Sequence, residues 1–310
     1  MNLYTSVELP AGLLRLTHAD RLLLLGSCFA AEMGERLLSA KFRCDVNPYG
    51  VLYNPLSISV ALREIEAGRS YGAEDLFLFR ELWHSPMHHG DFSSADKEKV
   101  LETINTRLQE AHAVFSQLDY LLLTFGTAWV YESKETGRVV SNCHKQPETK
   151  FTRRKLSVDE IVLDYKELLS DVLLRNPKLK VLFTVSPIRH VRDGLHANNL
   201  SKATLLLAVE QLQMLFPGHV FYFPAYELLL DELRDYRFYA EDMVHPSKLA
   251  VDYVWERFVH SCISADALQI MEESENIRKS LAHRPFHPES DEYKRFLGQI
   301  VLKIDRLNGK

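Results

Sequence analysis

Residues 21–30 have the sequence RLLLLGSCFA, and this stretch decides the fold. The apolar run over 21–25 predicts a buried β-strand, and the pattern over 29–40 predicts the helix that follows it. Gly26 lies between them and permits a tight turn, because a residue without a side chain tolerates backbone angles that others avoid. The stretch therefore predicts a strand, turn and helix of an α/β domain.

Short apolar runs followed by longer helical patterns recur along the rest of the chain. We expect further strands at 120–125, 180–185 and 220–223, and further helices at 158–175, 201–216 and 248–262. Continuous apolar strands that alternate with helices predict a parallel sheet with helices on both faces.

The remaining segments suggest how the chain is divided. Residues 41–118 are less regular, although 58–68 looks helical, and we expect an insertion that covers the site at one end of the sheet. The end of the chain looks helical, with a break at 285–288. We therefore expect an α/β domain over 1–265 and a helical C-terminal extension over 266–310.

Composition and charge exclude several classes of protein. A chain of 310 residues, 46% hydrophobic and 25% charged, fits one large globular domain. Its formal net charge of -5 provides no basic field, so we expect no nucleic-acid partner and no membrane insertion. Residues 1–20 carry no signal-peptide pattern, and the four cysteines form no Cys-x-x-Cys pair, which predicts a cytoplasmic protein without a zinc knuckle. Gly-x-Gly-x-x-Gly and Walker patterns are missing, and we expect no cofactor. The oligomeric state is left open.

Ser27 and Cys28 follow the first predicted strand, at the edge where a parallel sheet binds its ligands. They also begin a helix, whose free N–H groups and dipole lower the pKa of a thiol and can hold the oxyanion of a tetrahedral intermediate. Two simpler roles stay open. Ser27 could be only the N-cap of the helix, and Cys28 could be an inert buried thiol.

Asp242 and His245 lie three residues apart, just before the last predicted helix of the domain. A carboxylate at this spacing can orient the imidazole, which then acts as a general base. The pattern is common by chance, and Pro246 at the first helical position would give His245 a capping role instead. It is the combination with a nucleophile at a strand end that favours an acyl-transfer site.

Residues 26–30 match the motif for which the GSCFA-domain family is named, and the chain resembles this family in further segments. These are NPYG at 47–50, YNP at 53–55, TFGTA at 124–128, NCHK at 142–145, SPIRH at 186–190, SKAT at 201–204 and DMVHP at 242–246. The family is grouped with the SGNH/GDSL hydrolases. The resemblance implies a flavodoxin-like three-layer α/β/α sandwich with the nucleophile and the Asp-x-x-His pair at opposite ends of the sequence.

The resemblance also implies roles for individual residues. The first SGNH block reads Gly-Asp-Ser, which makes Cys28 the candidate nucleophile and Ser27 the second candidate. His245 is then the general base and Asp242 the group that orients it. A small acyl ester, such as an acylated sugar, is the implied substrate, and the implied activity is that of an esterase, an acyl hydrolase or an acyltransferase.

The expected oxyanion hole departs from the SGNH pattern. The resemblance assigns it to the N–H groups of Cys28 and Gly50, together with Gly126 in the third block. That block normally reads Gly-x-Asn, but Ala128 stands where the asparagine is expected. The residues that could replace it are Asn142, Asn47 and Asn54. The departure leaves an alternative open, a catalytically impaired protein that binds a ligand on the same fold.

Other polar residues are candidates for substrate binding. They are Asn47, Asn54, His88, His89, Thr127, His144, Ser186, Arg189 and His190. Arg189 could bind an anionic group of the substrate, or it could be a solvated arginine in a surface loop. His84, His88 and His89 could bind a metal ion, but Pro86 interrupts the helix that would bring them together, and we expect no metal site.

Overall fold

The computed structural model describes residues 5–9, 13–282, 286 and 290–308. Within these residues, the centre is a sheet of five parallel strands in the order β10-β9-β5-β1-β2. The strands are β1 (Arg21–Gly26), β2 (Arg43–Val46), β5 (Tyr120–Phe125), β9 (Lys180–Val185) and β10 (Val220–Tyr222). When these five strands are numbered by their order in the chain, their order across the sheet from β2 to β10 is 2-1-3-4-5, which is the flavodoxin-like arrangement. The expected fold class is confirmed.

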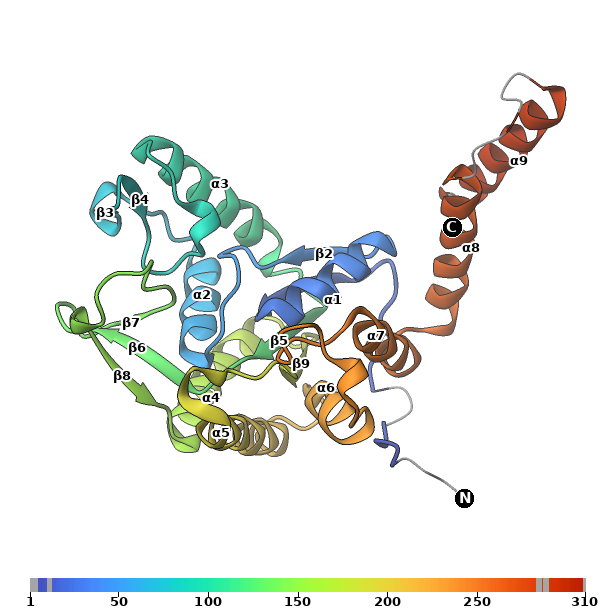
Figure 1. Ribbon diagram of the computed structural model, residues 1–310. Helices are drawn as coiled ribbons and strands as arrows, with labels where there is room; N and C mark the ends of the chain where they lie inside the picture. The colour runs from blue at the N-terminus through green and yellow to red at the C-terminus, as the bar shows by residue number, and fades with distance from the viewer. Residues whose placement is uncertain (1–4, 10–12, 283–285, 287–289, 309–310) are drawn as a thin grey trace.

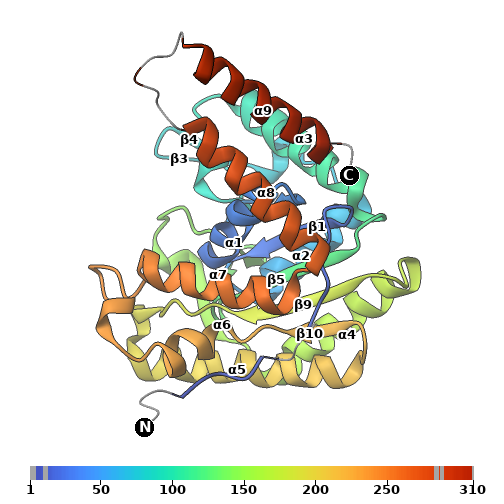
Figure 2. The ribbon, with the colours of Figure 1, turned by 90° about the vertical axis from the view of Figure 1, so that its right-hand side faces the viewer.

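Helices cover both faces of this sheet (Figures 1 and 2). Because side chains alternate along a strand, Leu23 and Leu25 of β1 belong to one buried cluster, and Leu22 and Leu24 belong to another. The first face is covered by α2 (Pro55–Ala67), α3 (Lys97–Phe115), α4 (Val158–Arg175) and α5 (Gly194–Leu215). The second is covered by α1 (Cys28–Ser39), α6 (Ala225–Glu227) and α7 (Lys248–Cys262). The sheet is therefore the middle of three layers.

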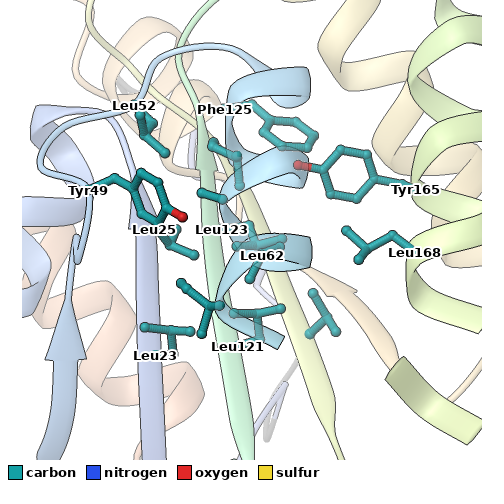
Figure 3. Packing of buried hydrophobic residues seen from close by; sticks show 14 of the residues in the cluster. Leu23, Leu25, Tyr49, Leu52, Leu62, Leu121, Leu123, Phe125, Tyr165 and Leu168 are labelled. Atoms are coloured by element: carbon teal, nitrogen blue, oxygen red, sulfur yellow. The ribbon is translucent and has the colours of Figure 1, made fainter. Parts of the chain in front are cut away.

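The core on the first face holds the start of α2 in place. Figure 3 shows Leu121 and Leu123 of β5 close to Leu62 of α2, with Tyr165 of α4 beside them. The Tyr165 hydroxyl donates a hydrogen bond to the carbonyl of Pro55 at 2.9 Å. This bond ties α4 to the first residue of α2, next to the loop that contributes to the site described below.

Side-chain caps mark the starts of three helices, α2, α4 and α7. Asn54 accepts a hydrogen bond from the N–H of Ser57 at the start of α2. At α4, Ser157 and Glu160 form a capping box. Ser247 caps α7, which begins at Lys248. These caps satisfy N–H groups that have no partner within the helix.

Residues 41–118 are more regular than the irregular insertion that we expected. β2 pairs with β1 along its whole length, and α2 and α3 contribute Ile58 and Ile104 to the main core. The rest comprises the hairpin of β3 (Phe77–Phe79) and β4 (Leu82–His84) and the 3-10 helices η1 (Ala73–Asp75) and η2 (Gly90–Phe92). Much of this segment is thus part of the domain's core, because it supplies an edge strand and two covering helices.

A second, antiparallel sheet lies between β5 and α4 in the sequence. Its strands are β6 (Trp129–Ser133), β7 (Val139–Val140) and β8 (Phe151–Lys155), in the order β7-β6-β8. The short elements near it and later in the chain are η3 (Glu148–Lys150), η4 (Val191–Asp193), the π-helix η5 (Leu228–Glu232) and η6 (Tyr236–Phe238). This small sheet forms one wall of the candidate site.

The C-terminal segment forms two helices, α8 (Ala265–Ala282) and α9 (Asp291–Asn308), which project from the body (Figure 1). Most of the expected break at 285–288 lies outside the described residues. The domain boundary after residue 265 stays a prediction. In the described ranges, we find no helix with the length and apolar character needed to span a bilayer.

Candidate active site

A cavity of about 380 Å³ lies at the carboxyl ends of β1, β5 and β9. This is the edge where a parallel sheet binds its ligands, since the loops that leave neighbouring strands converge there. The lining residues come from the start of α1, the loop before α2, the small sheet, the segment after β9 and the loop before α7. They are Ser27, Cys28, Tyr53, Asn54, Thr127, Trp129, Tyr131, Val140, Ser141, Arg153, Ser186, Ile188, Arg189, His190, Arg192, Asp193, Val244 and His245.

Gly26 makes the turn at the end of β1 possible. Its φ is +151°, and a Cβ at this position would lie 2.4 Å from the carbonyl oxygen of Thr124 on β5. A larger residue is excluded both by the backbone angle and by the neighbouring strand. The close approach fixes where the next two residues, Ser27 and Cys28, enter the cavity.

Ser27 and Cys28 differ in their accessibility. Ser27 occupies the N-cap position of α1 but makes no capping hydrogen bond, and only 1% of its surface is exposed. Cys28 is the first helical residue and is half-buried, and its sulfur lies 3.6 Å from the hydroxyl oxygen of Tyr53. Burial, followed by the hydrogen bond with Cys28, raises the pKa of Tyr53, so its phenol stays protonated near neutral pH. Cys28 is thus the more accessible of the two candidates.

Asp242 holds the imidazole of His245. The Nδ1 atom of His245 lies 2.5 Å from one carboxylate oxygen, and the other accepts the N–H groups of Val244 and His245 at 2.9 Å each. The backbone hydrogen bond from His245 is the main cause that lowers the pKa of Asp242 to about 2. With Nδ1 donating to the carboxylate, Nε2 of His245 is left as a proton acceptor.

His245 has no capping role. Helix α7 begins at Lys248 and is capped by Ser247, so Pro246 is not at the first helical position, which the alternative capping role of His245 required. Cys28 and His245 both line the cavity, although no hydrogen bond between described residues joins them. Both residues therefore lie on the wall of one crevice.

Most of the expected oxyanion donors are already engaged. The N–H of Gly50 donates to the carbonyl of Asn47 at 2.7 Å, and the N–H of Gly126 donates to the carbonyl of Tyr53 at 2.8 Å. In this structure these two N–H groups are therefore not free to hold an oxyanion, contrary to our expectation. The N–H of Cys28 has no acceptor among the described residues, and it remains available.

The three asparagines that could replace the missing donor do not do so in this structure. The Asn54 side chain lines the cavity but is engaged with Ser57 on both its oxygen and its nitrogen. Asn47 accepts the N–H of Gly26, Asn142 accepts the N–H of His144, and neither asparagine lines the cavity. Asn47 and Asn142 therefore stabilise loops.

His88, His89 and His144 do not line the cavity, contrary to expectation. His88 stacks on Tyr49 with ring centroids 4.4 Å apart, and burial lowers its pKa to about 3. The ring of His144 is tilted against that of His84, with centroids 4.3 Å apart, and burial lowers the pKa of His144 to about 4. His88 and His144 therefore pack as neutral rings near pH 7. Among the described residues, no three His, Cys, Asp or Glu side chains converge as a metal site would require.

The other residues expected to contact the substrate do lie on the cavity wall, and so do several residues that sequence analysis missed. Thr127, Ser186, Arg189 and His190 line the cavity as expected. The missed residues with aromatic rings or charges are Tyr53, Trp129, Tyr131, Arg153, Arg192 and Asp193. The alternation of aromatic residues at 129 and 131 was a usable signal, because it is typical of a strand with one face toward a ligand.

Lys202 of α5 holds the floor of the site from below. Its ammonium donates to the carbonyls of Gly126 and Ser186 at 2.6 and 2.7 Å, so it links the chain just beyond the ends of β5 and β9. The residue is 1% exposed, and no carboxylate pairs with it in the described part of the chain. Burial lowers the pKa of Lys202 to about 7.

The sequence matches two protein-family models, and the structure is similar to those of two esterases. The GSCFA family model matches residues 21–258, and the model described as GSCFA domain protein, C-terminal domain, matches 274–310. The chain is similar to a carbohydrate esterase family 3 structure from Talaromyces cellulolyticus, at 11% identity and a TM-score of 0.36, covering 82% of this chain and 99% of that one. It is also similar to an acetyl xylan esterase from the rumen bacterium Butyrivibrio proteoclasticus, at 10% identity and a TM-score of 0.38, covering 79% and 63%. No curated protein matches the sequence. The similarity to these two structures is too distant to assign an activity to this chain.

Proposed function

The chain belongs to the GSCFA family, and from this premise and the geometry of the cavity we propose that it is an esterase-type hydrolase of small acyl esters. Cys28 is the nucleophile, His245 the general base and Asp242 the group that orients it. The observation that carries the proposal is that Cys28, at the amino terminus of α1, and the imidazole held by Asp242 line the same cavity.

The reaction runs in two halves. His245 Nε2 takes the thiol proton of Cys28, and the sulfur attacks the ester carbonyl carbon, so that a C–S bond forms and the carbonyl oxygen becomes an oxyanion. When this intermediate collapses, the C–O bond breaks and the alcohol leaves with the proton from His245. Water then gives a proton to His245 and attacks the thioester, the C–S bond breaks, and the acid leaves as the thiol is restored.

The environment of Cys28 supports the nucleophilic role. A thiolate at a helix amino terminus is stabilised by the helix dipole, and the protonated hydroxyl of Tyr53 is placed to donate to it. The free N–H of Cys28 is a donor for the oxyanion. Ser27 is disfavoured as the nucleophile, because it is buried.

His190 supplies the donor that Ala128 cannot. Its Nε2 atom is buried, has no hydrogen-bond partner among the described residues, and lies 3.3 Å from where a Cβ on Gly126 would be, beside the third block. Burial, then the charge of Lys202, lowers the pKa of His190 to about 4, so the ring is neutral near pH 7. A neutral imidazole can donate one N–H to an oxyanion without competing with His245 as a base.

The test compares the hydrolysis of p-nitrophenyl acetate by wild type and variants. We expect Cys28→Ala and His245→Ala to lose activity, and Ser27→Ala to keep the covalent step. Cys143→Ala is the matched control, since Cys143 is another half-buried cysteine and does not line the cavity. Mass spectrometry should find the acyl group on Cys28. Full activity of Cys28→Ala or His245→Ala would refute the mechanism.

A second function, ligand binding without turnover, is favoured by one observation. The N–H of Gly50 is engaged and Ala128 offers no side-chain donor, which weakens the oxyanion hole. A binding protein would bind an ester or acid without forming an acyl-enzyme, and its Cys28 would react slowly with iodoacetamide at pH 7. Rapid alkylation of Cys28 together with ester turnover would eliminate this alternative.

A further inference from the structure

The cavity wall concentrates buried polar atoms that lack partners. Among the described residues, twelve buried side-chain nitrogen and oxygen atoms have no hydrogen-bond partner, and half of them belong to residues that line this one cavity. These six are Ser27 Oγ, Trp129 Nε1, Tyr131 Oη, Arg153 Nε, Arg189 Nε and His190 Nε2. Unpaired buried polar atoms destabilise a fold unless a ligand or water satisfies them. Their concentration here indicates a ligand.

The chemistry of these atoms indicates what the ligand must offer. Trp129 Nε1, Arg153 Nε and Arg189 Nε carry hydrogens and can only donate. The hydroxyl of Tyr131 can donate as well. The unpaired atoms of the cavity wall are therefore complementary to a ligand with several acceptor oxygens.

Arg189 differs from the other two arginines on the wall. Arg153 makes a two-pronged ion pair with Asp193, and Arg192 pairs with Glu148. Arg189 is half-buried, and within the described ranges it has neither a carboxylate partner nor a hydrogen-bond acceptor. An unpaired guanidinium that is partly removed from water is costly, and a bound anion offsets this cost.

The small sheet makes the rest of this wall rigid. Arg153 of β8 lies directly opposite Tyr131 of β6, and its guanidinium lies over the rings of Trp129 and Tyr131, 4.5 and 5.3 Å from their centroids. The ion pair with Asp193 also holds this guanidinium in place. The carboxylate of Asp193 is thus engaged and leaves the charge of Arg189 unopposed.

We propose that Arg189, with the rim formed by Trp129 and Tyr131, is a subsite for a negatively charged oxygen group of the substrate, a carboxylate or a phosphate. The subsite shares its cavity with Cys28, so the anionic group and the scissile ester belong to one molecule. This assignment to the substrate rests on the proposed function, whereas binding of the anion does not. A chain of net charge -5 needs such a local cation to attract an acidic substrate.

The first experiment measures binding without turnover. Cys28→Ala protein is titrated with succinate, inorganic phosphate and, as a neutral control, glycerol, using isothermal titration calorimetry. We expect one of the anions to bind and glycerol not to. Adding Arg189→Gln should weaken anion binding by about 10- to 100-fold, since a hydrogen bond to a charged group contributes roughly 1.5–3 kcal/mol.

The second experiment asks which part of the ester carries the charge. The esters are p-nitrophenyl acetate, mono-p-nitrophenyl succinate with an acidic acyl part, and 4-acetoxybenzoate with an acidic alcohol part. In Arg189→Gln, the ratio of kcat/KM for the preferred acidic ester to that for the neutral one should fall about 10- to 100-fold. Arg189→Lys should restore part of it. Arg63→Gln, which alters a half-buried arginine of α2 outside the cavity, is the control and should keep the wild-type ratio.

The two proposals fail in different ways. If Arg189→Gln binds the anions as well as its parent and keeps the wild-type ratio, the subsite is overturned and acyl transfer stands. If wild type hydrolyses none of the esters but anion binding still depends on Arg189, acyl transfer is overturned and the subsite stands. Thermal unfolding of each variant identifies one that has failed to fold, in which case Arg189→Lys serves as the test.

Discussion

Lys202→Met should remove a pH dependence of stability that the wild type owes to one buried amine. Lys202 is fully buried, and its pKa falls from 10.5 to about 7. Between these two values the unfolded chain binds a proton at this lysine that the folded chain lacks. Raising the pH therefore favours the folded state, and the wild type gains stability from about pH 7 toward pH 10.5.

The magnitude follows from the width of that window. Each pH unit within it contributes about 1.4 kcal/mol to the free energy of unfolding, and the whole window from 10.5 to about 7 corresponds to at most about 5 kcal/mol. Below about pH 7 both states bind the proton, so this contribution is flat and the cost of the buried charge is fully present. Methionine has a similar length and no charge, so its protein lacks the slope.

The assay is urea unfolding followed by tryptophan fluorescence at pH 6, 7, 8 and 9, in wild type and Lys202→Met. The difference between their free energies of unfolding should rise by about 1.4 kcal/mol per unit between pH 8 and 9. Groups other than Lys202 titrate in both proteins and cancel. Lys166→Met, at an exposed lysine of α4, is the control and should run parallel to wild type. If the free energy of unfolding of Lys202→Met changed with pH in parallel with that of wild type, the reasoning would be refuted.

The remaining predictions concern the site and the core. Asp242→Asn should lower kcat by about 10²- to 10⁴-fold on p-nitrophenyl acetate. Because the pKa of Asp242 is about 2, the pH profile of the wild-type rate should show no inflection from this carboxylate above about pH 4. Tyr53→Phe removes the hydroxyl beside the sulfur, and iodoacetamide should alkylate Cys28 about tenfold more slowly at pH 7; an equal rate would exclude a role for Tyr53 in stabilising the thiolate. Leu123→Ala should destabilise the core by about 2–5 kcal/mol in urea unfolding, and a loss below 1 kcal/mol would contradict the burial of Leu123.

Sequence analysis found the strands that have apolar runs, and the inner strands β5 and β9 among them are buried on both faces. β5 and β9 have continuous apolar sequences and were predicted with their observed bounds. β2 was missed because Arg43–Val46 is a short edge strand with the sequence RCDV, partly exposed and without an apolar run. An edge strand pairs on one side only, and its side chains need not be apolar.

The candidate site was only partly predictable, because a sequence shows which residues follow a strand but not where loops fold back. Cys28 and His245 could be named from their positions at element ends. The engagement of the Gly50 N–H depends on the turn that places the Asn47 carbonyl 2.7 Å away, and no spacing reveals it. Tyr53 reaches the sulfur of Cys28 from a loop distant in sequence, and this contact exists only in three dimensions.

Two separate sheets contribute to the cavity. The reacting groups stand at the ends of the central sheet, whereas Trp129, Tyr131 and Arg153 belong to a small sheet that shares no strand with it. Changes in the small sheet can therefore alter which molecules enter without moving the atoms that react. Substitutions in the small sheet should therefore change substrate preference more than they change the rate of the chemical step.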